Sequence, residues 1–370
     1  MKPPPLIFSP SSPQPQSIDE GMIARKLEGL VQGRVAPGVA VTAGRGERVL
    51  TKQAAGRLTW DADSPEASPG RSVYDLASMT KPVLSVAVMM LVDEGKLRLE
   101  DPVGRYLPEF THGAKSRVSV ADLLGHTSGL PGYPGKLELE GLRPEAVRAR
   151  MLAKPLISPP GRPSGYSNIG YVILREVATR AAREPVEAYL ERRVFRPLGM
   201  RDTGFRPSPS RTAPTSPDHN PSGTLVGVPQ DRLARSLEGY AGSAGLFSTA
   251  RDMGRFAAML ASGGSLDGVR YLAPETLQRF TTPVGGRIWA LGWRTNATPE
   301  SEAGRAFSRA AFGHYGYTGT LMWIDPQTRS WTVVLSNGRY RWQVSDNRQK
   351  EEVFSLAHSL NAAAAAAASS

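Results

Sequence analysis

Apolar and polar residues alternate in different ways at the ends of the chain and in its middle. Apolar residues recur at helical spacing over 17–31, where Ser17 and Glu20 have the spacing of a capping box. Short runs typical of paired strands lie near both termini, and a last helix is expected over 347–360. The expected strands are 39–43 with 48–52, and 321–324 with 332–336. This pattern predicts an α+β fold with an antiparallel sheet built from both termini and a mostly helical domain inserted between.

The middle of the chain opens with a run that has no polar face. From Val83 to Val92 every residue except Ser85 is apolar. A helix that is apolar all round is buried inside a domain. Because proline fits only in the first turn of a helix, Pro82 places the start of this helix close to Ser78. Gly95 is expected to end it.

Composition narrows the functional class. The 370 residues include 40% hydrophobic and 21% charged residues, as in globular proteins, and no cysteine. The missing cysteine excludes a thiol nucleophile, a disulfide scaffold and an iron–sulfur cluster. The five histidines show no metal-binding spacing, and the chain has neither a phosphate-binding loop nor a Gly-x-Ser-x-Gly elbow. We therefore expect no metal and no cofactor.

The charge is strongly basic. The net charge is +11, with 36 arginines against nine lysines, and a balance of this kind is typical of nucleic-acid binding. The densest basic stretch matches no binding module and has few aromatic residues nearby. It consists of Arg192, Arg193, Arg196, Arg201 and Arg206. We interpret it as a solvated surface and expect no nucleic-acid partner.

The chain ends suggest segments outside the folded unit. Residues 1–17 are proline-rich and hold one short apolar cluster, whereas a secretion signal needs about 7–15 apolar residues. No window approaches the roughly 20 apolar residues of a membrane span. We expect a flexible leader over 1–17, one unit over 18–361 and a low-complexity tail over 362–370, in a cytoplasmic protein without a membrane partner. Within the unit, the α/β part is expected over about 18–75 and 265–361 and the helical part over about 76–264.

Three short motifs carry candidate chemistry. Ser78 and Lys81 form a Ser-x-x-Lys, which places an amine one helical turn from a hydroxyl. A serine hydroxyl is a weak nucleophile until a neighbouring base takes its proton, and an amine whose charged form is disfavoured can do so. Segments 166–168 and 314–316 are the only Tyr-x-Asn and Lys/His-x-Gly in the chain. Each motif alone is more typical of structural residues.

In this order the motifs resemble those of the penicillin-recognising serine hydrolases, the branch of class C β-lactamases, DD-peptidases and family VIII carboxylesterases. The resemblance covers roughly residues 19–360 and implies a β-lactamase/transpeptidase-like fold. Supporting stretches include YDLASMTK (74–81), LLGHTSGLPG (123–132), YSNIGY (166–171), AGLFSTARDM (244–253), LGW (291–293) and GHYGYTGT (313–320).

The resemblance implies roles for individual residues. Ser78 would be the acylated nucleophile and Lys81 its proton partner. Tyr166 would share the general-base role and return the proton to the leaving group, which needs a phenol with a lowered pKa, and Lys81 would be the nearby cation. Asn168 would hydrogen-bond the acyl side chain of the substrate and help to orient Lys81.

The third motif is expected to form another wall of the substrate site. His314 and Gly316 would bind substrate, and the N–H groups of Ser78 and Tyr317 would form the oxyanion hole. The resemblance places Tyr317 on the strand that follows the motif. His126, in the segment 123–132, is interpreted as a structural residue that fixes its loop through backbone hydrogen bonds.

The third motif departs from the Lys-Thr-Gly usual in enzymes that hydrolyse β-lactams well. Histidine is mostly neutral at pH 7 and a poorer carboxylate anchor than lysine, and Tyr315 should narrow the cleft. We therefore predict a serine esterase acting on small esters. The alternatives are a β-lactamase or D-amino-acid peptidase, with an ester or amide substrate, and a catalytically silent binding protein. Selectivity for carboxylate-bearing substrates should rise as pH falls through the His314 pKa.

Overall fold

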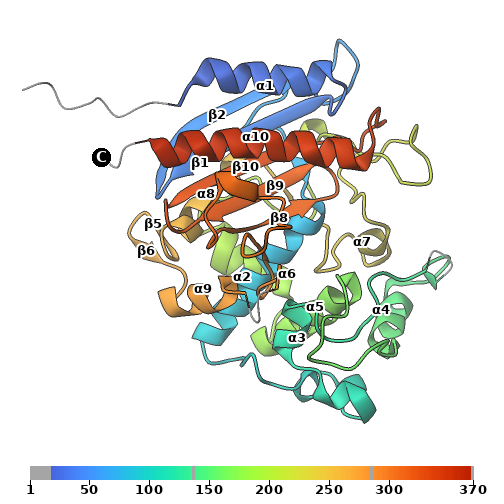
Figure 1. Ribbon diagram of the computed structural model, residues 1–370. Coiled ribbons are helices and arrows are strands. Elements are labelled where there is room, and N and C mark those ends of the chain that lie inside the picture. Colours follow the sequence, from blue (N-terminus) through green and yellow to red (C-terminus); the bar gives the residue numbers. More distant parts are fainter. Residues whose placement is uncertain (1–17, 136–137, 284–286, 368–370) are drawn as a thin grey trace, which may run out of the picture.

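The computed structural model describes residues 18–135, 138–283 and 287–367 (Figure 1). The predicted leader and the expected cap at Ser17 lie outside these residues. Helix α1 (Glu20–Gln32) begins after Asp19, whose side chain accepts a hydrogen bond from the Met22 N–H at 2.9 Å. The predicted capping box is therefore wrong, because Asp19 directly precedes the helix and takes the capping position.

The centre of the molecule is a six-stranded antiparallel sheet in the order β2-β1-β10-β9-β8-β7. Val39 of β1 pairs with Ser336 of β10, so the first and last strand pairs join directly. The predicted sheet built from both termini is confirmed. The strands are β1 (Gly38–Arg45), β2 (Arg48–Gly56), β7 (Arg294–Thr295), β8 (Phe312–Gly316), β9 (Thr320–Asp325) and β10 (Ser330–Ser336).

Helices cover both faces of this sheet. Helices α1 and α10 (Asp346–Ala366) lie side by side on one face, and α10 crosses in front of the strands in Figure 1. Helix α8 (Ala250–Ala261) packs against β1 and β10, although it falls within the range expected for the helical part. Residues 362–366, expected in the tail, continue α10, and Ala364 is buried.

The other helices form the lower part of the molecule in Figure 1. Every residue from Thr80 to Leu91 is buried, which confirms the predicted buried helix, and α2 packs against α5, α6 and α9. Gly95, just past its end, has φ of +68°, a conformation that glycine adopts without strain. The helices are α2 (Thr80–Asp93), α3 (Val120–Leu124), α4 (Pro144–Ala153), α5 (Asn168–Ala182), α6 (Val186–Leu190), α7 (Arg232–Ser236) and α9 (Pro274–Thr281). Two short strand pairs are β3 (Tyr74–Asp75) with β4 (Phe247–Ser248), and β5 (Ser265–Leu266) with β6 (Val269–Arg270).

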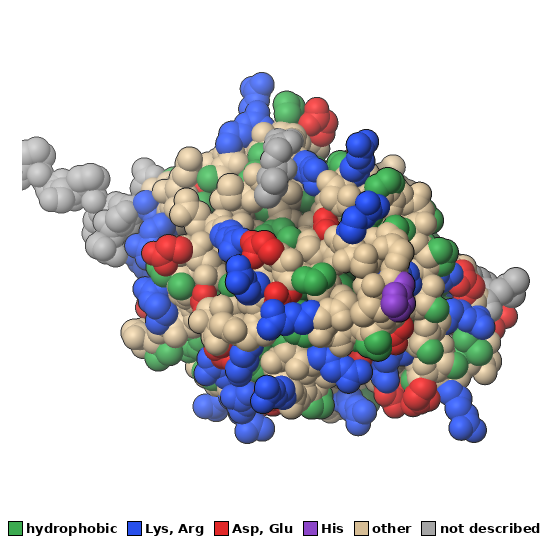
Figure 2. Space-filling view, turned by 90° about the horizontal axis from the view of Figure 1, so that it is seen from below, with side chains coloured by type: hydrophobic (Ala, Val, Ile, Leu, Met, Phe, Trp, Pro, Cys, Tyr) green, Lys and Arg blue, Asp and Glu red, His purple; other side chains and the backbone are tan. Residues whose placement is uncertain are grey.

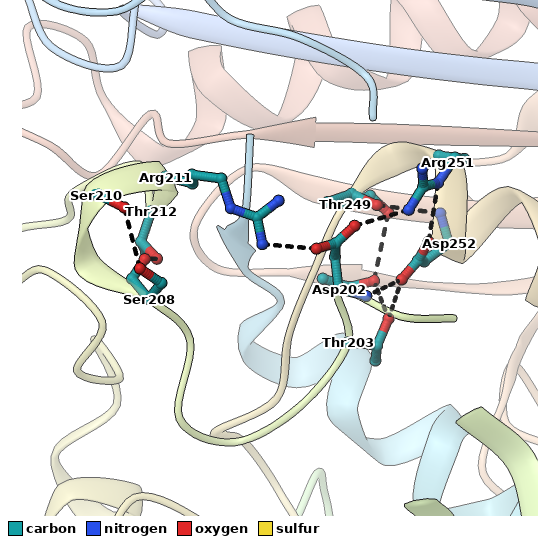
Figure 3. A network of polar contacts seen from close by, with 10 residues as sticks. Asp202, Thr203, Ser208, Ser210, Arg211, Thr212, Thr249, Arg251 and Asp252 are labelled. Carbon is teal, nitrogen blue, oxygen red and sulfur yellow. Dashed lines mark hydrogen bonds and ion pairs between the residues drawn. The ribbon is translucent and has the colours of Figure 1, made fainter. Parts of the chain in front are cut away.

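The segment 244–253, part of the resemblance, stabilises the junction with α8 (Figure 3). The Thr249 hydroxyl caps α8 by accepting the Asp252 N–H at 3.2 Å. The buried Asp252 carboxylate accepts the Asp202 N–H at 2.7 Å and the Thr203 hydroxyl at 3.1 Å. These hydrogen bonds hold the start of α8 to the segment around residue 202.

Many arginines lie close to acidic partners. In Figure 2, Lys and Arg side chains are spread over the face seen from below, with Asp and Glu among them. Three arginines of the densest basic stretch form ion pairs, Arg192 with Glu184, Arg193 with Glu94 and Arg196 with Glu191. Local pairing therefore compensates part of the charge in this stretch. None of the helices in the described ranges is long and apolar enough to cross a membrane.

Candidate active site

Ser78 lies in a tight turn between β3 and α2. The turn is a single 3-10 turn, Ala77–Met79, in which Ala77 has φ of +46°, a left-handed conformation that is strained for alanine. The buried Asp75 carboxylate accepts the Ala77 N–H at 2.9 Å and the Gln230 N–H at 2.7 Å. Asp75 therefore fixes the turn that carries Ser78 and joins it to the segment around residue 230. Burial raises the pKa of Asp75 to about 6.

The third motif packs directly against the same turn. The hydroxyls of Thr318 and Thr320 donate to the carbonyls of Asp75 and Leu76 at 2.7 and 3.0 Å. A Cβ at Gly316 would lie 2.4 Å from the Leu76 carbonyl oxygen. Only glycine permits this approach, so Gly316 sets the distance between β8 and the turn that carries Ser78.

Lys81 is fully buried and has three polar contacts through Nζ. These are Asn168 Oδ1 at 2.8 Å, the Ser243 carbonyl oxygen at 2.9 Å and Ser78 Oγ at 3.2 Å. The two oxygens of Asn168 and Ser243 act only as acceptors, so Lys81 must donate to both. A neutral amine has only two N–H groups, which leaves its lone pair for the Ser78 hydroxyl.

Burial lowers the pKa of Lys81 to about 7, and the negative charge of Asp231 opposes this effect. A large share of the amine is therefore neutral at neutral pH. Its position 4.6 Å from the centre of the Tyr166 ring favours the ammonium form to a smaller degree. Lys81 thus combines the geometry and the pKa of a proton acceptor for Ser78.

Tyr166 faces Ser78 and Lys81, but its electrostatics differ from the prediction. Burial raises the pKa of the Tyr166 phenol, and the nearby Ser78 hydroxyl lowers this pKa only in part. The expected lowering of the phenol pKa is therefore wrong. The cause is desolvation of a buried ring, which disfavours the phenolate more than nearby cations favour it. The phenol keeps its proton at neutral pH.

Backbone hydrogen bonds hold the Tyr166-to-Asn168 segment in place. The His126 ring accepts the Ser167 N–H at 3.1 Å through Nδ1, and the Asn168 N–H donates to the Gly132 carbonyl at 2.7 Å. The His126 ring lies 4.6 Å from the Tyr166 ring, centre to centre. These contacts agree with the structural interpretation of His126, and burial lowers its pKa to about 3.

His314 is a buried residue of β8, and its ring lies near those of Tyr166 and Trp289. Its Nδ1 lies 2.8 Å from the Tyr315 carbonyl oxygen, so Nδ1 carries the proton and Nε2 is an acceptor without a partner among the described residues. Burial, with help from Lys81, holds the pKa of His314 well below its usual range. This lowered pKa argues against the predicted pH-dependent selectivity, which requires a ring that becomes charged near pH 6.5; the selectivity itself stays a prediction.

Tyr317 lies in the turn after β8, not on a strand as expected. The guanidinium of buried Arg339 lies 4.3 Å from the centre of the Tyr317 ring and donates to its hydroxyl. Gln349 Nε2 donates to the Tyr317 carbonyl at 3.3 Å. The side chain and the carbonyl of Tyr317 are thus both fixed, and Tyr317 lines the same cavities as Ser78.

Two cavities meet at Ser78. The larger, which we call the Asp231 cavity, has a volume of about 460 Å³. The smaller, which we call the Arg294 cavity, has a volume of about 230 Å³. Ser78, Tyr166 and Tyr317 line both. The Asp231 cavity is also lined by Tyr133, Asn168, Asp218, Gln230, Asp231, Arg232 and Arg235, and the Arg294 cavity by Trp289, Arg294, Glu302, His314, Tyr315 and Lys350.

Sequence reasoning missed the charged residues of both cavities. Asp231 lies in no motif and is brought to the site by the hydrogen bond between Asp75 and Gln230. Tyr133 and Arg294 directly follow the segments 123–132 and 291–293, and this adjacency is the signal that could have found them. Within the described part of the chain, no group of three His, Asp or Glu side chains is arranged to hold a metal ion.

Comparison with known proteins supports the resemblance. The model of the Beta-lactamase family matches residues 23–353. A protein of Escherichia coli (strain K12) named "Putative D-alanyl-D-alanine carboxypeptidase" is 30% identical over 79% of this chain and 75% of its own length. Among solved structures, the β-lactamase/D-alanine carboxypeptidase of Pseudomonas syringae aligns with a TM-score of 0.73 at 18% identity, over 92% of this chain and 98% of that one.

EstCE1, described as a hydrolase with promiscuous acyltransferase activity, aligns with a TM-score of 0.73 at 22% identity. The alignment covers 91% of this chain and 99% of the EstCE1 chain. Both structural alignments confirm the predicted β-lactamase/transpeptidase-like α+β fold. Because the family match spans most of the folded chain, this protein belongs to the Beta-lactamase family and is a serine hydrolase.

Proposed function

We propose that this enzyme hydrolyses small carboxylic esters through an acyl-enzyme on Ser78, with Lys81 and Tyr166 as its proton-transfer pair. The observation that carries the proposal is the set of contacts around the Lys81 amine. Two obligate acceptors occupy its N–H groups, and the third contact is Ser78 Oγ at 3.2 Å. With a pKa of about 7, the amine can take the hydroxyl proton at neutral pH.

In the acylation step, Lys81 accepts the Ser78 proton while Oγ attacks the ester carbonyl carbon. The carbonyl oxygen becomes an oxyanion, which the N–H groups of Ser78 and Tyr317 would stabilise. As the C–O bond to the leaving group breaks, the proton on Lys81 passes to the departing alkoxide through the Tyr166 hydroxyl. The raised pKa of Tyr166 fits a relay that receives one proton as it donates another. Water then attacks the acyl-enzyme, with neutral Lys81 again available as the base.

The third motif supports esters over β-lactams. His314 is a neutral hydrogen-bond acceptor at the position where Lys-Thr-Gly enzymes have a cation. A penicillin carboxylate would lose that ion pair, whereas a neutral ester needs none. Asn168 directs Oδ1 toward Lys81, which leaves its Nδ2 donor for the acyl side of the substrate.

The test is hydrolysis of p-nitrophenyl butyrate beside a chromogenic cephalosporin, with mass spectrometry of the protein after a short reaction. We expect ester turnover, a mass increase of one butyryl group on the peptide that contains Ser78, and loss of about 10⁴-fold in kcat for Ser78→Ala. Ser85→Ala is the matched control, because Ser85 lies on the same buried helix and donates only to the Lys81 carbonyl, at 2.9 Å. Strong cephalosporin turnover with negligible ester cleavage would overturn the proposal, as would full activity in Ser78→Ala.

A second candidate function is a peptidase that releases a D-amino acid. The Arg294 cavity favours it, because Glu302 pairs with both Arg294 and Lys350 and one positive charge is left over. A leaving group with a free carboxylate would meet that charge. The name of the Escherichia coli relative points the same way. Release of D-alanine from an acyl-D-alanyl-D-alanine peptide, measured beside ester turnover, distinguishes the two functions.

A further inference from the structure

Asp231 is a charged residue of the larger cavity that the proposed reaction does not use. Its side chain shares the cavity wall with Ser78 and Asn168. Asp218, the other carboxylate of the cavity, accepts a hydrogen bond from Gln230 Nε2 at 2.8 Å and pairs with Arg339 at 3.7 Å. No ion pair within the described residues includes Asp231. The negative charge of Asp218 is therefore paired with a cation, whereas that of Asp231 is not.

The Asp231 carboxylate is held in one orientation. Its Oδ1 accepts the Ala234 N–H at 2.7 Å as the cap of α7, and its Oδ2 accepts the Tyr133 hydroxyl at 3.1 Å. The Leu233 N–H donates to the same Tyr133 oxygen at 2.9 Å. A carboxylate has about four acceptor positions, so these two hydrogen bonds leave capacity for a ligand.

Arg232 and Arg235 line the same cavity but form no ion pair with Asp231 among the described residues. Arg235 donates to the carbonyls of Pro229 and Gln230 at 2.7 and 2.5 Å. The Arg232 guanidinium lies 5.9 Å from the centre of the Tyr133 ring. A carboxylate in a cavity has lost part of its hydration. A cation that approaches it therefore stabilises its negative charge. Burial raises the pKa of Asp231, and the positive charges of Lys81 and Arg235 oppose this only in part.

We infer that Asp231 selects substrates whose acyl group carries a protonated amine, which it binds as an ion pair on the wall of the larger cavity. The inference rests on the proposed function, because it assigns this cavity to the acyl side of the substrate. The assignment follows from Asn168, whose free amide donor lines the same cavity beside Ser78. Asp231 is thus a specificity-determining residue for the acyl group and takes no part in proton transfer.

The test compares two esters that differ in charge alone. The p-nitrophenyl esters of 6-aminohexanoate and heptanoate have the same length, and at neutral pH only the first ends in an ammonium group. The ratio of their kcat/KM values, each divided by the rate of spontaneous hydrolysis, measures selectivity for the amine. Any change in Lys81 basicity cancels in this ratio, because both esters depend on the same base.

The variant is Asp231→Asn, which removes the charge and keeps a residue that caps helices well. Asp218→Asn is the matched control on the same cavity wall, because its charge is already paired. We expect the wild type to prefer the amino ester by at least about tenfold, which is the scale of one compensated charge pair. Asp231→Asn should remove that preference through a higher KM for the amino ester, and Asp218→Asn should change the ratio by less than about twofold.

Saturation-transfer NMR with 6-aminohexanamide and heptanamide gives a readout that needs no turnover. If both esters react equally, or if Asp231→Asn leaves the ratio unmoved, the inference is wrong while ester hydrolysis stands. If neither ester reacts, the proposed function fails, and binding of the two amides, measured by NMR, tests the inference about Asp231. Binding of the amine that is lost in Asp231→Asn then supports the inference, and equal binding of both amides overturns it.

Discussion

The two cavities that meet at Ser78 differ in how their charges are compensated. In the Arg294 cavity, one carboxylate lies between two cations, so the charges are largely paired with one another. In the Asp231 cavity, which Ser78 also lines, the Asp231 carboxylate has no ion pair among the described residues. The Arg294 cavity is built mainly from β8, α10 and neighbouring segments, whereas the Asp231 cavity is built mainly from α7 and loops of the helical part, with Tyr317 from the turn after β8. Paired charges leave a weak, general attraction for anions, while an unpaired charge can select one kind of ligand.

The largest effect is expected at Lys81, because substrates in either cavity would depend on the same proposed base. Lys81→Met should lower kcat/KM by about 10³-fold for every substrate, whichever cavity it occupies, because it removes the base. In the wild type, kcat/KM should rise with pH through about 7, since the pKa of Lys81 is about 7 and only the neutral amine accepts a proton. A pH–rate profile with p-nitrophenyl butyrate measures this. Lys115→Met, at a half-buried lysine outside both cavities, is the control.

The next effect concerns the Arg294 cavity alone. Arg294→Gln should lower the kcat/KM for a substrate with a leaving-group carboxylate by about tenfold relative to a neutral ester of the same size, because it removes the excess positive charge. Parallel kinetics with an ester of a hydroxy acid and with its methyl ester measure this ratio. Arg279→Gln, whose guanidinium pairs with Glu100, is the control. An unchanged ratio in Arg294→Gln would contradict a role of this cavity in leaving-group recognition.

A smaller effect is expected at the residue that positions Tyr317. Arg339→Met removes the stacked guanidinium and its hydrogen bond to the Tyr317 hydroxyl, so the N–H of Tyr317 should be held less firmly. We expect kcat to fall about fivefold at nearly unchanged KM, for substrates of either cavity. Arg339→Lys should recover part of the loss. A change in KM alone would assign Arg339 to substrate binding instead of positioning.

The smallest effect is expected from pH acting on His314. Because burial holds the pKa of His314 well below its usual range, we expect the ring to stay largely neutral between pH 5 and 8. The preference between a carboxylate-bearing and a neutral ester should therefore stay constant within about twofold over this range. A preference that rises steadily toward pH 5 would show that the ring becomes charged, and that His314 belongs to an anion site.

Local sequence patterns predicted many of the elements and the spacing of the Ser-x-x-Lys pair, whereas the other candidate site residues came from the resemblance. The apolar run 83–92 indicated a buried helix, because a helix without a polar face cannot lie at a surface. Ser78 and Lys81 share a helix face by spacing alone, and their Oγ-to-Nζ distance is 3.2 Å. The contact between Asn168 and Lys81 depends on a resemblance, since 87 residues separate them in the chain.

Electrostatic states were decided by the tertiary structure. A sequence shows which groups can titrate, but their desolvation depends on packing from distant segments. Tyr166 was expected to have a lowered pKa and His314 an ordinary one, yet burial moves the first up and the second down. Burial also lowers the pKa of Lys81 to about 7, where the amine can accept a proton at neutral pH. The spacing of Ser78 and Lys81 could only suggest this effect.

The chain by itself determined the Ser-x-x-Lys motif, the buried helix behind it and the sheet formed by its two ends, because these depend on local periodicity and spacing. Only the tertiary structure decided that Asp231 lines the same cavity as Ser78 and that Glu302 pairs with Arg294 and Lys350. The physical reason is that a side chain's charge acts over a few ångströms of space, and loops from separate regions meet at that distance only after folding.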